Sequence, residues 1–314
     1  MASAAVRGRG RLRAALVALL VFSGLQLACS APPFAAREPR QLAPLAWRAE
    51  GPRAGDGSLF LLGSIHLGRS EGLDFGPAVE AAYATSDELV VEVDLSLLSE
   101  QEIVAQSARF LVLPEGRMLR DELAPETWAK LEAYVRSRGV EIAAVERMKA
   151  WAVATVIAVM EFEAAGMQAE FGVDRHFIAD AAEAQRPIRG LETLQSQLEA
   201  LDGLSPRVQE LMLEDALARI EDDPSTLVTA WESGDEEGLA RQLLGPLETN
   251  PEFAEFYEVL FYRRNEEMTA QLAQLVRDGR RRFVVLGAAH MLDERGIPAL
   301  LRTRGFRVER VSGR

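Results

Sequence analysis

Apolar runs predict strands near both ends of the chain. The runs 88–93 and 283–286 are typical of strands covered on both faces, and 306–311 predicts a last strand. The stretches 45–49 and 59–62 flank a segment rich in Gly, Pro and Asp, which predicts a hairpin.

Between these strands the apolar residues recur with helical spacing, and prolines stand near three of the starts, where proline is tolerated. The predicted helices are 77–86, 97–108, 125–138, 149–166, 173–184, 206–221 and about 252–278. The apolar stretch 150–160 is too short to cross a membrane and predicts a buried helix. We expect an α/β fold: a mixed or mostly parallel sheet built from the N- and C-terminal segments, covered by helices, with a helical middle lobe.

The first 28 residues have the organisation of a secretory signal. Four arginines between positions 7 and 13 precede a short apolar run, 16–22, and small residues follow at 28–31. A helix in the core of the folded protein is a poor interpretation of this segment, because the four arginines would lie at its N-terminus, where cations are unfavourable. We expect residues 1–28 to be removed on export, 29–45 to be a flexible tether, and 46–314 to form the folded domain.

Cys29 is the single cysteine, so internal disulfides play no part in the mature chain. Its position suits a lipid-modified cysteine that anchors the protein to a membrane, although Gln26 stands where such signals usually have an aliphatic residue. The alternative is cleavage nearby, which would release a periplasmic protein. The net charge of −13 becomes −17 without residues 1–28 and their four arginines, and this argues against nucleic-acid binding.

Two of the three histidines occur in the same local setting. His66 and His290 each follow an apolar run by way of Gly-x-x-His, and strand ends are where α/β sheets bind ligands. Both imidazoles reach one edge of the sheet if the two strands are parallel neighbours. Glu92 interrupts a third apolar run, and a buried carboxylate needs a cation or strong donors. Two histidines and a glutamate would suit a divalent transition metal.

Each of these signals has a plainer interpretation. A single histidine at a strand end is more often a satisfied polar residue than a ligand, and Glu92 could point outward, because strand side chains alternate between faces. The recurrence of Gly-x-x-His, together with the carboxylate, favours a shared site.

Longer segments resemble the TraB/GumN family, which groups with the Tiki-type metalloproteases and the erythromycin esterase-like and ChaN-like proteins. The resemblance covers about residues 45–312. The family often has Gly-Thr-x-His where this chain has Gly-Ser-Ile-His, and a glycine near Asp293. The matching segments are Trp47, 61–66, 89–94, 149–151, 172–174, 190–193 with Gln195, Arg264-Asn265, 285–292, Gly296, 300–301 and 305–306.

The resemblance implies an active site on His66, Glu92 and His290, which are also the expected metal ligands. Three more residues are candidates. Glu192 either belongs to the site or caps a helix; Arg264 and Asn265 either bind a substrate carbonyl or carboxylate or lock a helix to the sheet. His176 is expected to be structural or at the surface.

We therefore expect a metal-assisted hydrolase of peptide or ester bonds, with Mn, Co or Zn as the ion and a peptide or small molecule as substrate. Glu92 or one histidine could instead be the general base without a metal. No His-Glu-x-x-His motif occurs, and a cleaved or acylated Cys29 excludes cysteine catalysis. The rival is a non-enzymatic exported protein that binds a ligand, for example haem, although no Cys-x-x-Cys-His for covalent haem is present.

Overall fold

The computed structural model describes residues 40–43, 45–69, 73–220, 222–245 and 250–311. The expected signal and Cys29 lie outside these ranges, as does most of the expected tether. Within the described end of that tether, Leu42 and Leu45 are buried.

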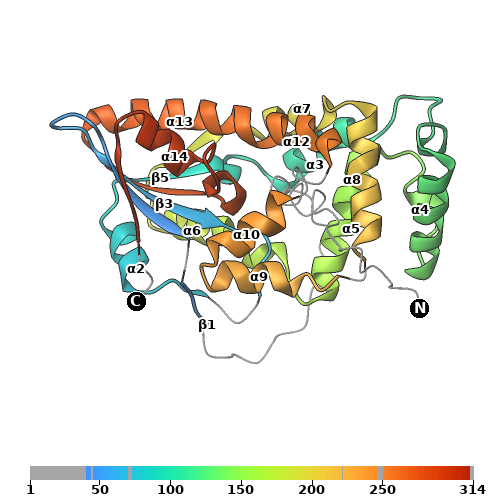
Figure 1. The fold of residues 1–314 in the computed structure, drawn as a ribbon, viewed down its shortest axis with the longest axis horizontal. Coiled ribbons are helices and arrows are strands. Elements are labelled where there is room, and N and C mark those ends of the chain that lie inside the picture. Colours follow the sequence, from blue (N-terminus) through green and yellow to red (C-terminus); the bar gives the residue numbers. More distant parts are fainter. Residues whose placement is uncertain (1–39, 44, 70–72, 221, 246–249, 312–314) are drawn as a thin grey trace, which may run out of the picture.

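A six-stranded sheet forms the centre of the fold, in the order β6-β5-β7-β3-β2-β8 (Figure 1). Its parallel strands are β3 (Ser58–Ser64), β5 (Glu88–Val93), β6 (Ile188–Glu192) and β7 (Arg281–Gly287). Strand β2 (Ala46–Glu50) pairs antiparallel with β3 and with β8 (Arg307–Arg310). The predicted hairpin and the mixed, mostly parallel sheet are thus confirmed, with β6 added from the middle of the chain. A separate parallel pair joins β1 (Arg40–Gln41) to β4 (Leu73–Asp74).

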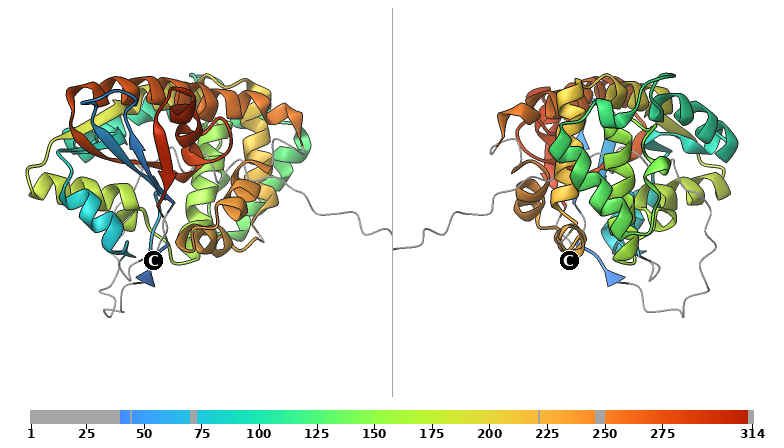
Figure 2. Two further views of the ribbon diagram at one scale, coloured as in Figure 1. Left: turned by 60° about the vertical axis from the view of Figure 1, so that its left-hand side comes forward. Right: turned by 90° about the vertical axis from the view of Figure 1, so that its right-hand side faces the viewer.

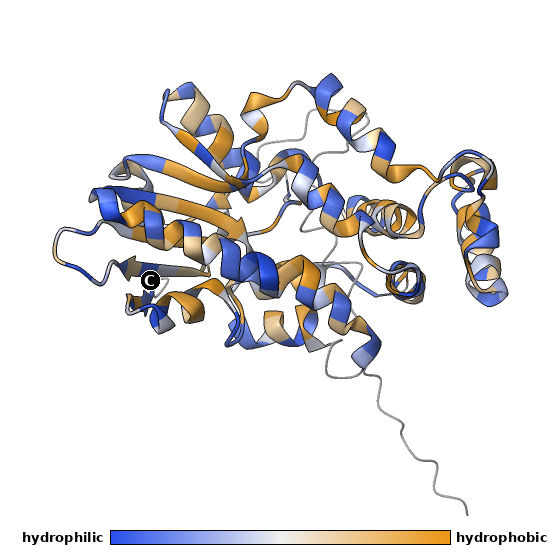
Figure 3. Ribbon diagram, turned by 90° about the horizontal axis from the view of Figure 1, so that it is seen from above, coloured by the Kyte–Doolittle hydropathy of each residue, from blue (hydrophilic) through white to orange (hydrophobic). Residues whose placement is uncertain are grey.

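Apolar packing fixes the neighbouring central strands β3 and β7. Phe60 and Phe283 stand opposite each other in the register, and their rings stack with centroids 5.4 Å apart. Val284 and Val285, within the apolar run, are at most 1% exposed. Helices cover both faces of the sheet, and consecutive residues of its central strands are buried. Figure 3 shows these strands as largely hydrophobic, in orange.

Helices cover the sheet and form a lobe beside it. Helices α7 and α13 lie over one face, and α2 and α6 under the other, while α4, α5 and α8 stand together to one side (Figures 1 and 2). The helices are α2 (Pro77–Ala84), α3 (Glu100–Leu111), α4 (Pro125–Ser137), α5 (Ala150–Ala164), α6 (Val173–Glu183), α7 (Leu194–Asp202), α8 (Pro206–Ala218), α9 (Ser225–Glu232), α10 (Glu236–Leu243), α12 (Ala254–Tyr257), α13 (Arg263–Leu275) and α14 (Ile297–Thr303).

Among the described residues, four helices, α7, α9, α10 and α14, lie outside the predicted ranges, and the long helix expected over 252–278 is divided. A π-helical turn, Glu258–Tyr262, separates α12 from α13. Helix α5 is buried as expected and packs against α8, with Trp151 and Ala154 at 0% exposure. Among the described residues no helix has the length and apolar character needed to cross a membrane.

Replacing Leu286 by Ala should lower the free energy of unfolding by about 2–5 kcal/mol, because Leu286 is 1% exposed in the central strand β7. Chemical denaturation measures this loss. As a control, Leu97→Ala should change stability by less than about 0.5 kcal/mol, because Leu97 is 77% exposed. Equal losses in the two variants would contradict the packing described here.

Candidate functional site

Strands β3 and β7 bring the two Gly-x-x-His segments to one edge of the sheet. They are parallel neighbours, with Gly63 opposite Leu286 and Ser64 opposite Gly287. His290 follows in a short 3-10 turn, Ala288–Met291. The condition for a shared edge is therefore met. Both imidazoles are buried, His66 at 7% and His290 at 2% exposure.

Glu92, near the end of the neighbouring strand β5, faces the same point. Its Oε1 accepts a hydrogen bond of 2.7 Å from the Gly287 N–H, and lies 3.6 Å from His290 Nε2. A Cβ on Gly287 would stand 3.1 Å from Glu92 Oε1, 3.6 Å from His290 Cδ2 and 3.9 Å from His66 Nε2. The two imidazoles and the carboxylate thus surround one position, which a larger residue at 287 would crowd.

Glu92 is a buried carboxylate held in its charged form. Burial raises its pKa, but the electrostatic interactions with His290, Arg264 and His66 and the hydrogen bond from the Gly287 N–H lower it to about 2. Its second oxygen, Oε2, accepts hydrogen bonds of 3.0 Å each from Gln197 Nε2 and Arg264 Nη2. The cost of burying this charge is therefore met by one guanidinium and two amide donors.

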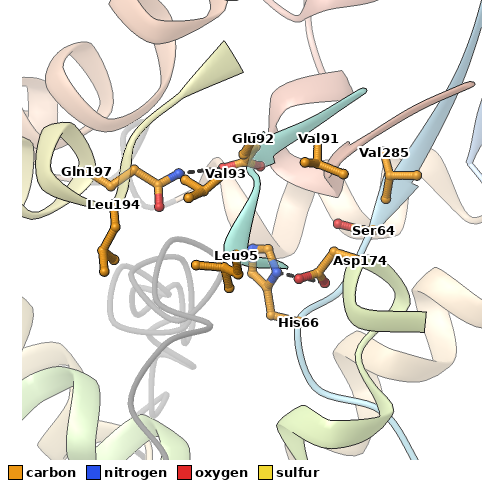
Figure 4. A pocket seen from close by; sticks show the side chains of 10 residues that line it. All are labelled: Ser64, His66, Val91, Glu92, Val93, Leu95, Asp174, Leu194, Gln197 and Val285. Carbon is orange, nitrogen blue, oxygen red and sulfur yellow. Dashed lines mark hydrogen bonds and ion pairs between the residues drawn. The ribbon is translucent and has the colours of Figure 1, made fainter. Parts of the chain in front are cut away.

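Asp174, at the start of α6, holds His66. The His66 Nδ1 and the Asp174 Oδ1 are 2.9 Å apart (Figure 4). Helix α6 docks on the backbone of this segment: Val173 N donates to Ile65 O at 3.0 Å, and a Cβ on Gly172 would come within 2.5 Å of the His66 carbonyl oxygen. Burial lowers the pKa of His66, but the Asp174 carboxylate more than offsets this, so the pKa is raised.

Asn265, on α13, holds His290 in the same way. The His290 Nδ1 lies 2.6 Å from Asn265 Oδ1, while Asn265 Nδ2 donates to the Arg295 carbonyl oxygen at 2.9 Å. Because an amide oxygen only accepts, Nδ1 carries the proton and Nε2, which faces Glu92, has the lone pair. Burial lowers the pKa of His290 to about 4, so this imidazole is neutral.

Arg264 joins the two glutamates of the site. Its Nε and Nη2 donate to Glu192 at 2.8 and 2.6 Å, and Nη2 also donates to Glu92. Nη1 donates at 2.6 Å to Leu260 O, within the π-helical turn before α13. Of the two interpretations offered for Arg264 and Asn265, these contacts favour the one in which both side chains lock α13 to the sheet and its site.

Glu192, the last residue of β6, does not cap the helix that follows. Thr193 is the N-cap of α7, in a capping box with Ser196. Glu192 instead bonds Arg264 and accepts from Gln197 Nε2 at 3.1 Å. The structure therefore places Glu192 beside the site, and the capping interpretation is wrong.

Three residues of the site were not predicted as functional. Asp174 belongs to the Gly-Val-Asp that carried the family resemblance, which was the available signal. Gln197 is not part of the family resemblance, which includes Gln195 two positions earlier. Gln195 itself donates a hydrogen bond of 2.7 Å to Glu199. Ser64 is the third of these residues and ends strand β3. All three line a cavity of about 20 Å³ (Figure 4), together with His66, Val91, Glu92, Val93, Leu95, Leu194 and Val285.

The donors suit a divalent ion in type and direction. Metal-ligating imidazoles usually donate their other N–H to a carboxylate or carbonyl group, as Asp174 and Asn265 allow here. Arg264 and Gln197 bind Oε2 of Glu92, so that Oε1 is the oxygen nearer His290. Within the described ranges, however, no three His, Cys, Asp or Glu side chains are gathered closely enough to hold an ion as they stand.

Two other predicted features lie outside this cluster. His176 is exposed and packs beside Phe75 with ring centroids 5.8 Å apart, as expected for a structural or surface residue. Asp293 has φ 63°, a backbone region that favours glycine, the residue that the family resemblance led us to expect near this position. Its carboxylate accepts hydrogen bonds from Arg295 N at 2.6 Å and from Tyr262 Oη at 3.2 Å.

Replacing Asp293 by Ala should lower the free energy of unfolding by about 1–2 kcal/mol, because both hydrogen bonds are lost while the positive φ remains. Asp293→Gly should be about 1 kcal/mol more stable than Asp293→Ala, since glycine adopts this φ without strain. Urea unfolding of the two variants compares them directly. If their midpoints coincide, backbone strain at position 293 is not significant.

Comparisons with known proteins show the family to which the chain belongs. The model of the TraB/PrgY/gumN family matches residues 45–310. Two relatives, both described as the uncharacterised protein YbaP, come from Escherichia coli strain K12 and Shigella flexneri, and are 23% identical over 257 residues and 24% identical over 251 residues. The alignments cover 79% and 77% of this chain, and 89% and 87% of the relatives. No solved structure matches. Because the family model spans most of its length, the chain belongs to the TraB/PrgY/gumN family.

Proposed function

We propose that the chain is a hydrolase of peptide or ester bonds, whose attacking water is activated between His66, Glu92 and His290. The observation that carries the proposal is their convergence around Gly287, within 4 Å of one point. Each of the three side chains also hydrogen-bonds a residue on a helix: Asp174 for His66, Gln197 for Glu92 and Asn265 for His290. Such fixed, buried groups are typical of reaction centres, where they avoid reorganisation during the reaction.

The charges of the cluster favour a divalent cation. Glu92, Asp174 and Glu192 are three carboxylates against the one guanidinium of Arg264, which leaves a formal charge of −2 when both imidazoles are neutral. His66 and His290 would hold the ion through Nε2, and Glu92 through Oε1. Mn, Co and Zn suit such mixed nitrogen and oxygen ligands. Bound there, the ion would lower the pKa of a water molecule and polarise the scissile carbonyl group.

The other groups of the chain orient these ligands. Asp174 and Asn265 accept the Nδ1–H of the two imidazoles and so fix which nitrogen of each ring is directed to the cluster around Gly287. Arg264 and Gln197 keep Glu92 ionised and hold its second oxygen away from the reacting water. The cavity of about 20 Å³ has room for about one water molecule.

Metal-free hydrolysis is a second candidate, favoured by the contact between Asp174 and His66. The carboxylate raises the pKa of this imidazole, which makes His66 a better base for removing a proton from water. The two candidates differ in their need for an ion, and removal of metal separates them.

Dialysis of the purified mature protein against a chelator should abolish hydrolysis of p-nitrophenyl esters or of a peptide library, and added Mn²⁺, Co²⁺ or Zn²⁺ should restore it. Elemental analysis should find about one ion per site before dialysis. Hydrolysis that persists in metal-free protein would select the metal-free candidate. A visible absorption band on addition of haem, without hydrolysis under any condition, would select the ligand-binding alternative.

Replacing Asp174 by Asn should lower metal affinity or kcat/KM about 10–100-fold, because the His66 Nδ1–H loses its charged acceptor. Titration with Co²⁺ and initial-rate measurements report the two effects. Asp180→Asn is the matched control: it lies on the same helix, α6, but its side chain is exposed. Equal activity of the two variants would show that Asp174 does not position His66 for the reaction.

A further inference from the structure

Ser64 has a buried hydroxyl group for which the protein offers no partner. It is the last residue of β3, has 0% exposure and stands opposite Gly287 in the strand register. Its Oγ makes no hydrogen bond to any described residue. Burying an unpaired hydroxyl costs free energy, so its retention at this position calls for an explanation.

The hydroxyl lies in the wall of the reaction pocket. Ser64 lines the same cavity as His66, Glu92 and Asp174, and Figure 4 shows it beside the His66–Asp174 pair. The hydroxyl can rotate to suit a bound group, since its hydrogen is not fixed by a protein acceptor.

Other donors around the pocket are already used by protein acceptors. The Gly287 N–H donates to Glu92, and Gln197 Nε2 donates to Glu92 and Glu192. The Arg264 guanidinium donates hydrogen bonds to the same two carboxylates and to the Leu260 carbonyl oxygen. Hydrolysis of an acyl bond, however, develops negative charge on the carbonyl oxygen, which needs a donor aimed at it.

We propose that the Ser64 Oγ–H donates a hydrogen bond to the carbonyl oxygen of the substrate and stabilises the charge that develops there. This inference rests on the proposed hydrolase function and adds a catalytic residue to it. The role requires only a hydroxyl group at this position. No bond to Ser64 forms or breaks in this role, so the attacking group remains water.

The test is Ser64→Ala in the metal-loaded protein, with p-nitrophenyl butyrate and a peptide library as substrates. We expect kcat to fall about 10²–10³-fold with KM little changed, as for loss of one oxyanion donor. We also expect the Tm to rise by about 2–4 °C, because the variant no longer buries an unpaired hydroxyl. Ser64→Thr should retain most of the activity, provided it folds with an unchanged Tm or higher.

Ser107→Ala is a matched control for stability. Ser107, on α3, is also 0% exposed, and its Oγ also lacks a hydrogen bond to the described residues, but it does not line the cavity. This variant should show a similar rise in Tm with unchanged kcat. Loss of activity in Ser64→Ala alone would then be due to the pocket hydroxyl, not to removal of a buried serine.

Several outcomes would overturn the proposal for Ser64. Full kcat in Ser64→Ala would exclude a donor role, and a lower Tm would show that the hydroxyl stabilises the fold instead. An acyl adduct on Ser64, detected by mass spectrometry, would make the residue a nucleophile and not a donor. Absence of hydrolysis by the wild-type protein is a different result, because it refutes the proposed function itself and the role of Ser64 with it.

Discussion

The buried ion pair between Arg264 and Glu92 is the interaction on which the site depends. It joins α13 to β5, and the second carboxylate on Arg264, that of Glu192, brings in β6. Arg264 and Glu92 are only 5% and 6% exposed, and removal of Arg264 would leave the carboxylates of Glu92 and Glu192 without their shared cation, a loss that typically costs about 3–5 kcal/mol. The same pair keeps Glu92 ionised beside two imidazoles. Stability and chemistry are therefore coupled at one contact.

The two imidazoles are held in parallel ways by helices on opposite faces of the sheet. Helix α6 supplies Asp174 to His66, and α13 supplies Asn265 to His290. Both partners bind Nδ1, so the two rings are held through the same nitrogen. The different partners give the imidazoles different electrostatics: a carboxylate raises the pKa of His66, whereas burial beside a neutral amide lowers that of His290.

Much of this site could be predicted from the chain because its main residues follow apolar runs. Two Gly-x-x-His segments and Glu92, each at the end of an apolar run, predicted a site at one edge of the sheet. The strands β5, β7 and β3 are neighbours in the sheet and bring these residues together. The residues that hydrogen-bond these side chains were harder to predict from the sequence. Asp174 and Gln197 lie near helix starts, where acidic and polar residues usually serve as caps, and each bonds a residue more than 100 positions away. The π-helical turn before Arg264 is as apolar as an α-helical turn, so the sequence pattern does not distinguish the two.

The central claim is that the ionised Glu92 takes part in hydrolysis, and an isosteric substitution tests it most directly. Glu92→Gln keeps the shape of the side chain and leaves Arg264 paired with Glu192. The measurement is kcat/KM of this variant relative to wild type, with circular dichroism to verify the fold. The account predicts a loss of about 10²–10⁴-fold in a folded protein, the usual contribution of a group that acts on the proton of the attacking water. Wild-type kcat/KM in folded Glu92→Gln would contradict it.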